Sequence, residues 1–395
     1  MSTEAFLVGG VRTPFGRFRG VLAESRPDDL AALVLGAALE RAGVAPDAVD
    51  EVIFGAANQA GEDNRNVARM AVLLAGLPDA VPGYTVNRLC ASSLQAVASA
   101  AQQVRSGEAD VVVAGGVESM TRAPMVLPKS ARPWAAADAV ADTTLGWRLV
   151  NPRMKEVDGG EATISLGETA EKVAVLDGVS REESDAFGLR SQQLTEDARE
   201  RLAQDLVSVA VRNGEVSTDE VPRPDSTSEG LAKLKPSFTT EGVVTAGTAS
   251  PLSDGAGAIV VASEDAVRRH GLTPRARVVA AASAGVPPSI MGLGPVPSTE
   301  KVLARSGWEL GDVEAVEINE AFATQVLASI RRLGLDPEIV NTYGGAIALG
   351  HPLGASGVRL VISLLRRLED GDGRRGLATL CVGVGQGMAL TVERV

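Results

Sequence analysis

Sulfur and imidazole side chains are scarce in this sequence, which has two cysteines and two histidines among its 395 residues. Three of these four residues, Cys90, His351 and Cys381, stand in turns rich in glycine or serine. A cysteine sulfur is a strong nucleophile once it is deprotonated, and a nearby histidine is its usual base. These residue types favour covalent catalysis at sulfur, provided that the fold brings them together.

Cys90 stands in TVNRLCASSLQAV, between a short strand-like stretch and an apolar stripe at helical spacing. We therefore expect it at or just before a helix N-terminus, where free backbone N–H groups lower the pKa of a thiol. The alternative is a small buried hydrophobic residue, which is common for a lone cysteine. Placement alone does not separate the two interpretations.

The other two reactive residues also have structural alternatives. His351 lies in GGAIALGHPLGASG, where a histidine can be held in a glycine-rich turn without any chemical role. Cys381 lies in LCVGVGQG at the end of a predicted strand. Backbone N–H groups in such a turn can bind an oxyanion, although a structural cysteine fits the same position.

Two further polar sites follow predicted secondary structure. Asn319 and Glu320 come directly after an apolar strand over 313–318. They can orient a water or a substrate carbonyl, or Asn319 can cap the next helix. His270 precedes Gly271 at a predicted helix end, and we interpret it as a structural cap.

An internal repeat organises the chain. Residues 41–58 align with 305–322 at an offset of 264, and residues 91–100 align with 355–364 at the same offset. Each copy predicts helix, strand, loop, helix and strand, so we expect two similar α/β halves with mainly parallel sheets covered by helices. The halves should pack about a pseudo-twofold axis, with the active site where they meet. Cys90 and His351 would then occupy near-equivalent turns that face each other.

An irregular stretch over 121–244 separates the repeats and is rich in proline, arginine and aspartate. It predicts one clear helix, which starts from the capping box of Ser180 and Glu183. An insertion of this length is typical of a lid or binding subdomain, so we expect it beside the active site. A strand over 256–262 should return the chain to the first half.

Composition disfavours several functions. The net charge is −12 and basic clusters are short, which argues against nucleic acid or an anionic membrane as partner. The longest apolar run, 30–39, predicts a helix too short to span a bilayer. The N-terminus lacks the charge and apolar pattern of a secretory signal, and two cysteines 291 positions apart form no disulfide framework. We expect a cytoplasmic protein.

Several motifs together resemble one family over the whole chain, the thiolases, which cleave or form 3-ketoacyl-CoA. They are VRTPFGRF from residue 11, NRLCASS around Cys90, GGVESM from 115, TAGTASPLSDGAGA from 245, NEAFA from 319, GGAIALGHPLGASG from 344 and CVGVGQG from 381. The resemblance implies two βαβαβαββ halves in a layered α-β-α-β-α core with an inserted loop domain. We expect residues 1–120 with 245–270 to form the first half, 121–244 the loop domain and 271–395 the second half.

The resemblance also implies roles for individual residues. Cys90 would take up the acyl group as a thioester. His351 would activate Cys90 and, with a water held by Asn319, stabilise the enolate or ketone oxygen. Cys381 would exchange the proton with the CoA thiol or the acetyl α-carbon. The backbone N–H groups of Cys90 and Gly383 would form a second oxyanion hole.

Coenzyme A is expected as a substrate, with no bound cofactor and no metal. By resemblance, Arg223 would lie near the nucleotide, and Ala246 and Ser250 along the pantetheine. Met291 and Phe322 are further substrate-binding candidates. Relatives of this kind also imply a homo-oligomer, either a dimer or a dimer of dimers.

Two segments, 61–71 and 142–152, look like those of degradative 3-ketoacyl-CoA and β-ketoadipyl-CoA thiolases, which act in fatty acid or aromatic degradation. Leu166 and Tyr343 depart from the common family pattern, and we expect both to alter the acyl pocket. The chain would therefore convert 3-ketoacyl-CoA and CoA to acyl-CoA and acetyl-CoA, or run the reverse Claisen condensation.

Three alternatives to this function remain. The first is a biosynthetic thiolase that forms acetoacetyl-CoA. The second is a ketoacyl synthase, which would want a second histidine where NEAFA stands and would lack a basic cysteine such as Cys381. The third is a non-catalytic acyl-CoA-binding protein on the same scaffold.

Overall fold

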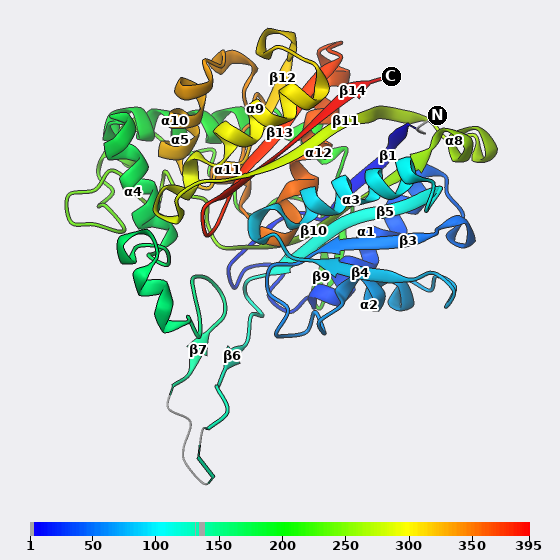
Figure 1. The fold of residues 1–395 in the computed structure, drawn as a ribbon, viewed down its shortest axis with the longest axis horizontal. Coiled ribbons are helices and arrows are strands. Elements are labelled where there is room, and N and C mark those ends of the chain that lie inside the picture. Colours follow the sequence, from blue (N-terminus) through cyan, green and yellow to red (C-terminus); the bar gives the residue numbers. More distant parts are fainter. Residues whose placement is uncertain (1–3, 131, 134–138) are drawn as a thin grey trace.

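A computed structural model describes residues 4–130, 132–133 and 139–395. Figure 1 shows two α/β halves against each other, with the inserted segment projecting at one side. The first half contains β1 (Ala5–Arg12), β2 (Gly16–Arg17), α1 (Pro27–Ala42), β3 (Glu51–Gly55), α2 (Val67–Leu74), β4 (Gly83–Val86), α3 (Ser92–Ser106), β5 (Val111–Ser119), β10 (Ser253–Ser263) and α8 (Glu264–His270). The second half contains β11 (Pro274–Gly285), α9 (Pro295–Ser306), β12 (Ala315–Ile318), α10 (Ala323–Leu333), α11 (Ala346–Leu349), α12 (Leu353–Asp370), β13 (Arg375–Val382) and β14 (Gln386–Arg394).

The strand order shows the pseudo-twofold relation between the halves. The main sheet runs β12-β13-β14-β11-β1-β10-β5-β3-β4, so the two halves meet at β11 and β1 with mirrored orders. Strands β3 and β12 begin at Glu51 and Ala315, and β5 and β13 begin at Val111 and Arg375. Within each pair, the two starting residues are 264 positions apart, which is the offset of the sequence repeat. The predicted duplicated fold is confirmed.

The prediction of mainly parallel sheets is wrong. Pairing is parallel between β3 and β4, β3 and β5, and β12 and β13, but antiparallel along β1, β10, β11 and β14. The cause of the error is burial on both faces of the sheet. All eleven residues of β10 are buried, so it lacks the alternating pattern by which an antiparallel strand is usually recognised.

Five layers build the core. The central layer is α3 and α12, whose apolar side chains pack against one face of each half of the sheet. The outer helices α1 and α2 cover the other face of the first half, and α9 and α10 that of the second. The backbone N–H of Val358 on α12 donates to Ser93 Oγ on α3 at 2.9 Å. The repeated helices thus lie together at the centre of the molecule.

The inserted segment contains more helix than its composition predicts. Its elements are β6 (Met125–Val126), β7 (Ala141–Asp142), α4 (Leu166–Asp177), α5 (Arg181–Asp197), α6 (Arg199–Ala203), β8 (Val209–Val211), β9 (Gly214–Val216) and α7 (Ser228–Ala232). The capping box of Ser180 and Glu183 is present at α5, as predicted. The expectation of a single clear helix is wrong. Helix α4 exposes Val175 and Leu176, which blurs its amphipathic pattern.

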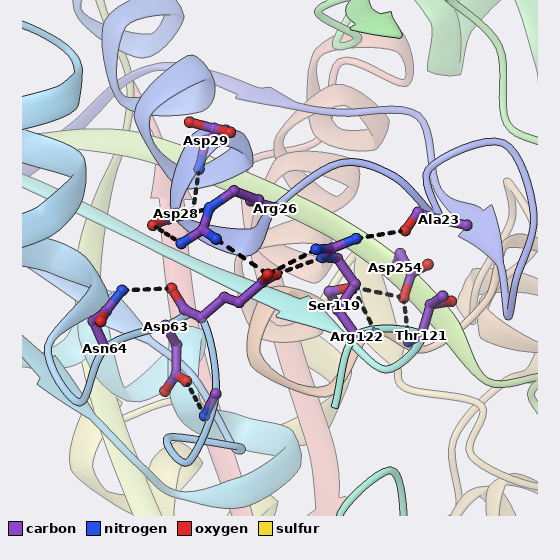
Figure 2. Close-up of polar contacts among 12 residues, drawn as sticks. Ala23, Arg26, Asp28, Asp29, Asp63, Asn64, Ser119, Thr121, Arg122 and Asp254 are labelled. Atoms are coloured by element: carbon purple, nitrogen blue, oxygen red, sulfur yellow. Dashed lines mark hydrogen bonds and ion pairs between the residues drawn. The ribbon is translucent and has the colours of Figure 1, made fainter. Parts of the chain in front are cut away.

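The start of the insertion is fixed on the first half by an ion-pair network (Figure 2). Arg122 donates to Glu62 at 2.7 Å and to the carbonyl of Ala23 at 3.1 Å. Arg26 contacts the same Glu62 at 3.1 Å and also binds Asp28. The insertion therefore leaves the core from an anchored position, which holds the residues that follow it near the site described below.

Three smaller expectations can be checked directly. Residues 30–39 lie within α1, and α8 ends at His270 with Gly271 in the left-handed conformation, as predicted. Cys90 and Cys381 are free and buried. Among the described residues, no helix combines the length and hydrophobicity needed to cross a membrane.

We keep the division into 1–120 with 245–270, 121–244 and 271–395 as our proposal for the domains.

Candidate active site

Cys90 lies in a tight turn between β4 and α3, just before the helix N-terminus, as predicted. The preceding Leu89 has a φ of 48°, a left-handed conformation that is strained for a side chain of this kind. Ser92 stabilises the turn, since its Oγ accepts from the N–H of Arg88 at 2.9 Å and donates to the Leu89 carbonyl at 2.7 Å. Strain held in this way is common where a nucleophile is aimed into a site.

His351 lies in the turn that precedes α12. Ser356 Oγ donates to the carbonyl of Pro352 at 2.9 Å and lies 2.5 Å from His351 Nδ1. Because the hydroxyl hydrogen of Ser356 is used in this way, we assign Nδ1–H as the donor and leave the lone pair on Nε2. Burial, with a contribution from the charge of Arg359, lowers the pKa of His351 to about 3. The imidazole is therefore neutral and can accept a proton.

Asn319 is fully buried directly after β12. Its Nδ2 lies 3.3 Å from His351 Nε2, and its Oδ1 accepts from Arg359 at 3.4 Å. Since Arg359 occupies the oxygen, the amide hydrogens face the imidazole. The alternative of a helix cap is wrong, because α10 begins at Ala323 with Phe322 in the N-cap position.

Cys381 lies near the end of β13, opposite the turn of Cys90. Its Sγ is 3.1 Å from the side-chain amide of Gln325. Burial raises the pKa of the Cys381 thiol, and the neighbouring Cys90 raises it further. The backbone N–H of Gly383, two residues later, lies near enough to Cys90 to lower the pKa of its thiol. Cys381 is thus a protonated thiol in the resting site.

The predicted lowering of the Cys90 pKa is wrong. Burial raises the pKa of its thiol to about 11, and the opposing N–H groups of Gly383 and Cys90 itself do not offset that cost. A thiolate would need a paired cation here, but His351 is neutral. The Cys90 side chain is a neutral thiol, which would have to lose its proton to act as a nucleophile. The two N–H groups are then available to an oxyanion.

Cys90 lies where two cavities meet. The catalytic cavity, about 230 Å³, is lined by all three reactive side chains and by Ser250, Met291, Phe322 and further apolar residues. The side cavity, about 400 Å³, continues past Cys90 along the 143–150 segment and Gly383. Cys90, His351 and Cys381 therefore line one cavity, where the turns of Cys90 and His351 face each other as the repeat predicted.

The remaining candidates differ in position. Asn319 reaches the site through His351 and is not part of either cavity wall. Arg223 and Ala246 are exposed and line neither cavity. Leu166 lines both cavities. Tyr343 lines neither, so the expectation that it alters the acyl pocket is wrong. The hydroxyl of Tyr343 is held at the surface by a carboxylate near the end of α12.

Ser356 and Gln325 contact the reactive groups but were not singled out from the sequence. A signal existed for Ser356, because a hydroxyl five residues after His351 falls on the first turn of the following helix. Gln325 had none, since its contact with Cys381 depends on how α10 packs beside β13. Both are positioned to orient a reactive side chain.

The raised Cys90 pKa has a measurable consequence. The fraction of thiolate increases about tenfold per pH unit below the pKa, so alkylation of Cys90 by iodoacetamide should accelerate from pH 7 to about pH 10 without reaching a plateau. Peptide mapping by mass spectrometry measures the rate at Cys90, and Cys381 in the same sample is the internal reference. A plateau by pH 8 would contradict the neutral resting thiol.

Comparison with known proteins decides the family. The family model for the N-terminal domain of thiolase matches residues 5–265, and that for the C-terminal domain of thiolase matches residues 272–394. The chain belongs to the thiolase family. This thiolase is 54% identical to the beta-ketoadipyl-CoA thiolase of Pseudomonas aeruginosa, over 100% of both chains. It is 51% identical to the 3-oxoadipyl-CoA/3-oxo-5,6-dehydrosuberyl-CoA thiolase of Escherichia coli, over 99% of this chain and 100% of the relative.

Comparison with solved structures supports the same family. Human mitochondrial 3-ketoacyl-CoA thiolase in complex with CoA is 39% identical, has a TM-score of 0.93, and is matched over 100% of this chain and 98% of its own. The predicted fold, family and class of enzyme are confirmed. This thiolase transfers acyl groups between CoA thioesters, with coenzyme A as its substrate.

Proposed function

We propose that this thiolase cleaves 3-oxoacyl-CoA through an acyl-Cys90 intermediate. Cys90 attacks the 3-oxo carbon, and its proton passes to the unprotonated Nε2 of His351. The bond between C2 and C3 breaks, and the acetyl-CoA enolate takes its proton from the Cys381 thiol. Asn319 and His351 provide donors for the oxygen that carries negative charge during this step.

The second half of the reaction restores every group. Cys381, now a thiolate, takes the proton of an incoming CoA thiol, and the CoA sulfur attacks the acyl-Cys90 thioester. The N–H groups of Cys90 and Gly383 receive the tetrahedral oxyanion. Cys90 leaves as a thiolate and recovers its proton from His351. Each proton removed is returned, so no metal or redox partner is needed for the balance.

One observation carries this proposal: all three reactive side chains line a single cavity of about 230 Å³. Burial keeps the imidazole of His351 neutral, so its lone pair can accept the Cys90 proton during attack. Ser250, Met291 and Phe322 in the same wall support a pantetheine path to Cys90. Arg223 and Ala246, exposed on the insertion side, stay candidates for contacts farther along CoA.

The substrate we propose is a 3-oxoacyl-CoA with a short chain that ends in a carboxylate. The names of the relatives in Pseudomonas aeruginosa and Escherichia coli support this choice. A thiolysis assay over acetoacetyl-CoA, 3-oxohexanoyl-CoA and 3-oxoadipyl-CoA tests it, and kcat/KM should be highest for 3-oxoadipyl-CoA. No cleavage of any of the three would contradict the proposed reaction. Highest kcat/KM for acetoacetyl-CoA would favour the biosynthetic alternative.

We also propose that the enzyme is a homo-oligomer, a dimer or a dimer of dimers. Strand β4 is an edge of the main sheet. In the neighbouring α2, the exposed fraction is 45% for Leu73 and 55% for Leu74. Sedimentation velocity should show at least a dimer, and a monomer at micromolar concentration would contradict this.

The need for two reduced cysteines supports a cytoplasmic location, where thiols stay reduced.

A further inference from the structure

The side cavity is placed to receive the acyl chain. It shares five wall residues with the catalytic cavity: Cys90, Leu145, Gly146, Leu166 and Leu353. A CoA thioester that reaches Cys90 through the catalytic cavity would direct the far end of its acyl group into the space beyond. Gly383, whose N–H lies near enough to Cys90 to lower the pKa of its thiol, lies in the wall of that space. The groups along this wall therefore decide which acyl chains fit.

Arg148 is the one cationic side chain among the described residues that line the side cavity. It is half-buried, and its Nη2 contacts Asn58 Oδ1 at 3.4 Å. No ion pair joins it to a carboxylate within the part of the chain that the structure describes. Asn58 is itself held by Thr143 at 2.9 Å, so the guanidinium has a fixed neighbour and an unmatched charge.

Nearby arginines differ from Arg148 in this respect. Figure 2 shows Arg26 and Arg122 within one polar network, where both bind the carboxylate of Glu62 and Arg26 also binds Asp28. Their charges are therefore compensated inside the protein. Arg148, in contrast, faces a cavity with its charge available to a ligand.

The cavity also contains one carboxylate, Glu118, which must be weighed against a negative ligand. Three backbone N–H groups already bind it, from Ala57 at 2.9 Å, Asn58 at 3.1 Å and Gly354 at 2.8 Å. These three N–H groups stabilise the carboxylate within the protein. It does not compensate Arg148, with which it forms no ion pair.

The rest of the wall suits a short chain with a polar end. Apolar contacts for methylene groups come from Leu145, Trp147 and Met154, and polar groups come from Asn87 and Thr144. An uncharged chain would leave the half-buried guanidinium without a partner. A chain that ends in a carboxylate would satisfy it with charge-assisted hydrogen bonds.

We propose that Arg148 binds the distal carboxylate of the acyl group and selects 3-oxoacyl-CoA substrates whose chain ends in an acid. The inference rests on the proposed thiolysis reaction and adds its specificity residue. With 3-oxoadipyl-CoA, the group left on Cys90 after cleavage of the C2–C3 bond is a four-carbon acid, and Arg148 holds its free carboxylate. Acetyl-CoA leaves, and CoA then takes the four-carbon acyl group.

The test compares two substrates of equal chain length, 3-oxoadipyl-CoA and the uncharged 3-oxohexanoyl-CoA. Arg148→Met should lower the ratio of their kcat/KM values by about 10- to 100-fold, because a charged hydrogen-bonded contact is lost with only one of them. Arg148→Lys should recover part of the ratio. Arg153→Met, which removes an exposed arginine from the same segment, is the matched control and should leave the ratio unchanged.

Other outcomes overturn the assignment. An unchanged kcat/KM ratio in Arg148→Met, or an equal loss of kcat/KM with both substrates, would show that Arg148 does not bind the distal carboxylate. Faster cleavage of 3-oxohexanoyl-CoA than of 3-oxoadipyl-CoA by the unaltered enzyme would also refute the role, while thiolysis itself would stand. Failure of the unaltered enzyme with both substrates would instead refute the proposed reaction.

Discussion

Cys90→Ser should lower thiolysis by about 10³-fold or more while leaving the protein folded. A hydroxyl is far less acidic than a thiol, and the neutral His351, with a pKa of about 3, is too weak a base to compensate. The substitution is nearly isosteric and the residue lies in a cavity wall, so packing should be little disturbed. A spectrophotometric assay with acetoacetyl-CoA measures the loss.

Two controls make the Cys90 result decisive. Thermal unfolding of the variant should match that of the unaltered protein, which separates loss of chemistry from loss of fold. Incubation with radiolabelled acetyl-CoA should label the unaltered protein and leave Cys90→Ser unlabelled. Persistent acyl labelling of the variant would remove Cys90 as the nucleophile.

Cys381→Ser should separate acylation from turnover. Cys90 and His351 remain intact, so the variant should still form the acyl-enzyme from acetyl-CoA. Without the Cys381 thiol, neither the enolate nor the incoming CoA has its proton partner, and turnover should fall by about 10²- to 10⁴-fold. Single-turnover labelling and steady-state thiolysis on the same preparation measure the two effects.

Gln325→Ala is the companion variant for Cys381, because it removes the neighbour at 3.1 Å and leaves the thiol in place. Its turnover should fall much less than that of Cys381→Ser. Near-normal turnover in Cys381→Ser would remove Cys381 as the acid and base. A loss of acylation as large as the loss of turnover would show that the substitution disturbs the Cys90 turn.

The duplicated fold could be predicted because the repeat is carried by local patterns. The constant offset of 264 residues predicted that the turns of Cys90 and His351 face each other, and the helices α3 and α12 that follow these turns pack together in the structure. Strand direction was not predictable from the same patterns. Burial on both faces removes the alternation that distinguishes antiparallel strands, as β10 shows.

The charge state of the site also lay beyond the sequence. The turn before α3 suggested an acidic Cys90 thiol, but its pKa depends on burial among segments that are distant in the chain. Leu89, Trp147 and Gly383 meet at that point in the cavity wall. The proton position on His351 likewise depends on Ser356 and on the Pro352 carbonyl, which only the folded turn brings together.

We propose that the acyl group is carried on Cys90 in a cavity shared with His351 and Cys381. The direct measurement is acid quenching within milliseconds of mixing with 3-oxoadipyl-CoA in the absence of free CoA, followed by peptide mass spectrometry. We expect a four-carbon acid in thioester linkage on the peptide that contains Cys90. An acyl group on Cys381, or a reacting enzyme with no acylated peptide, would contradict it.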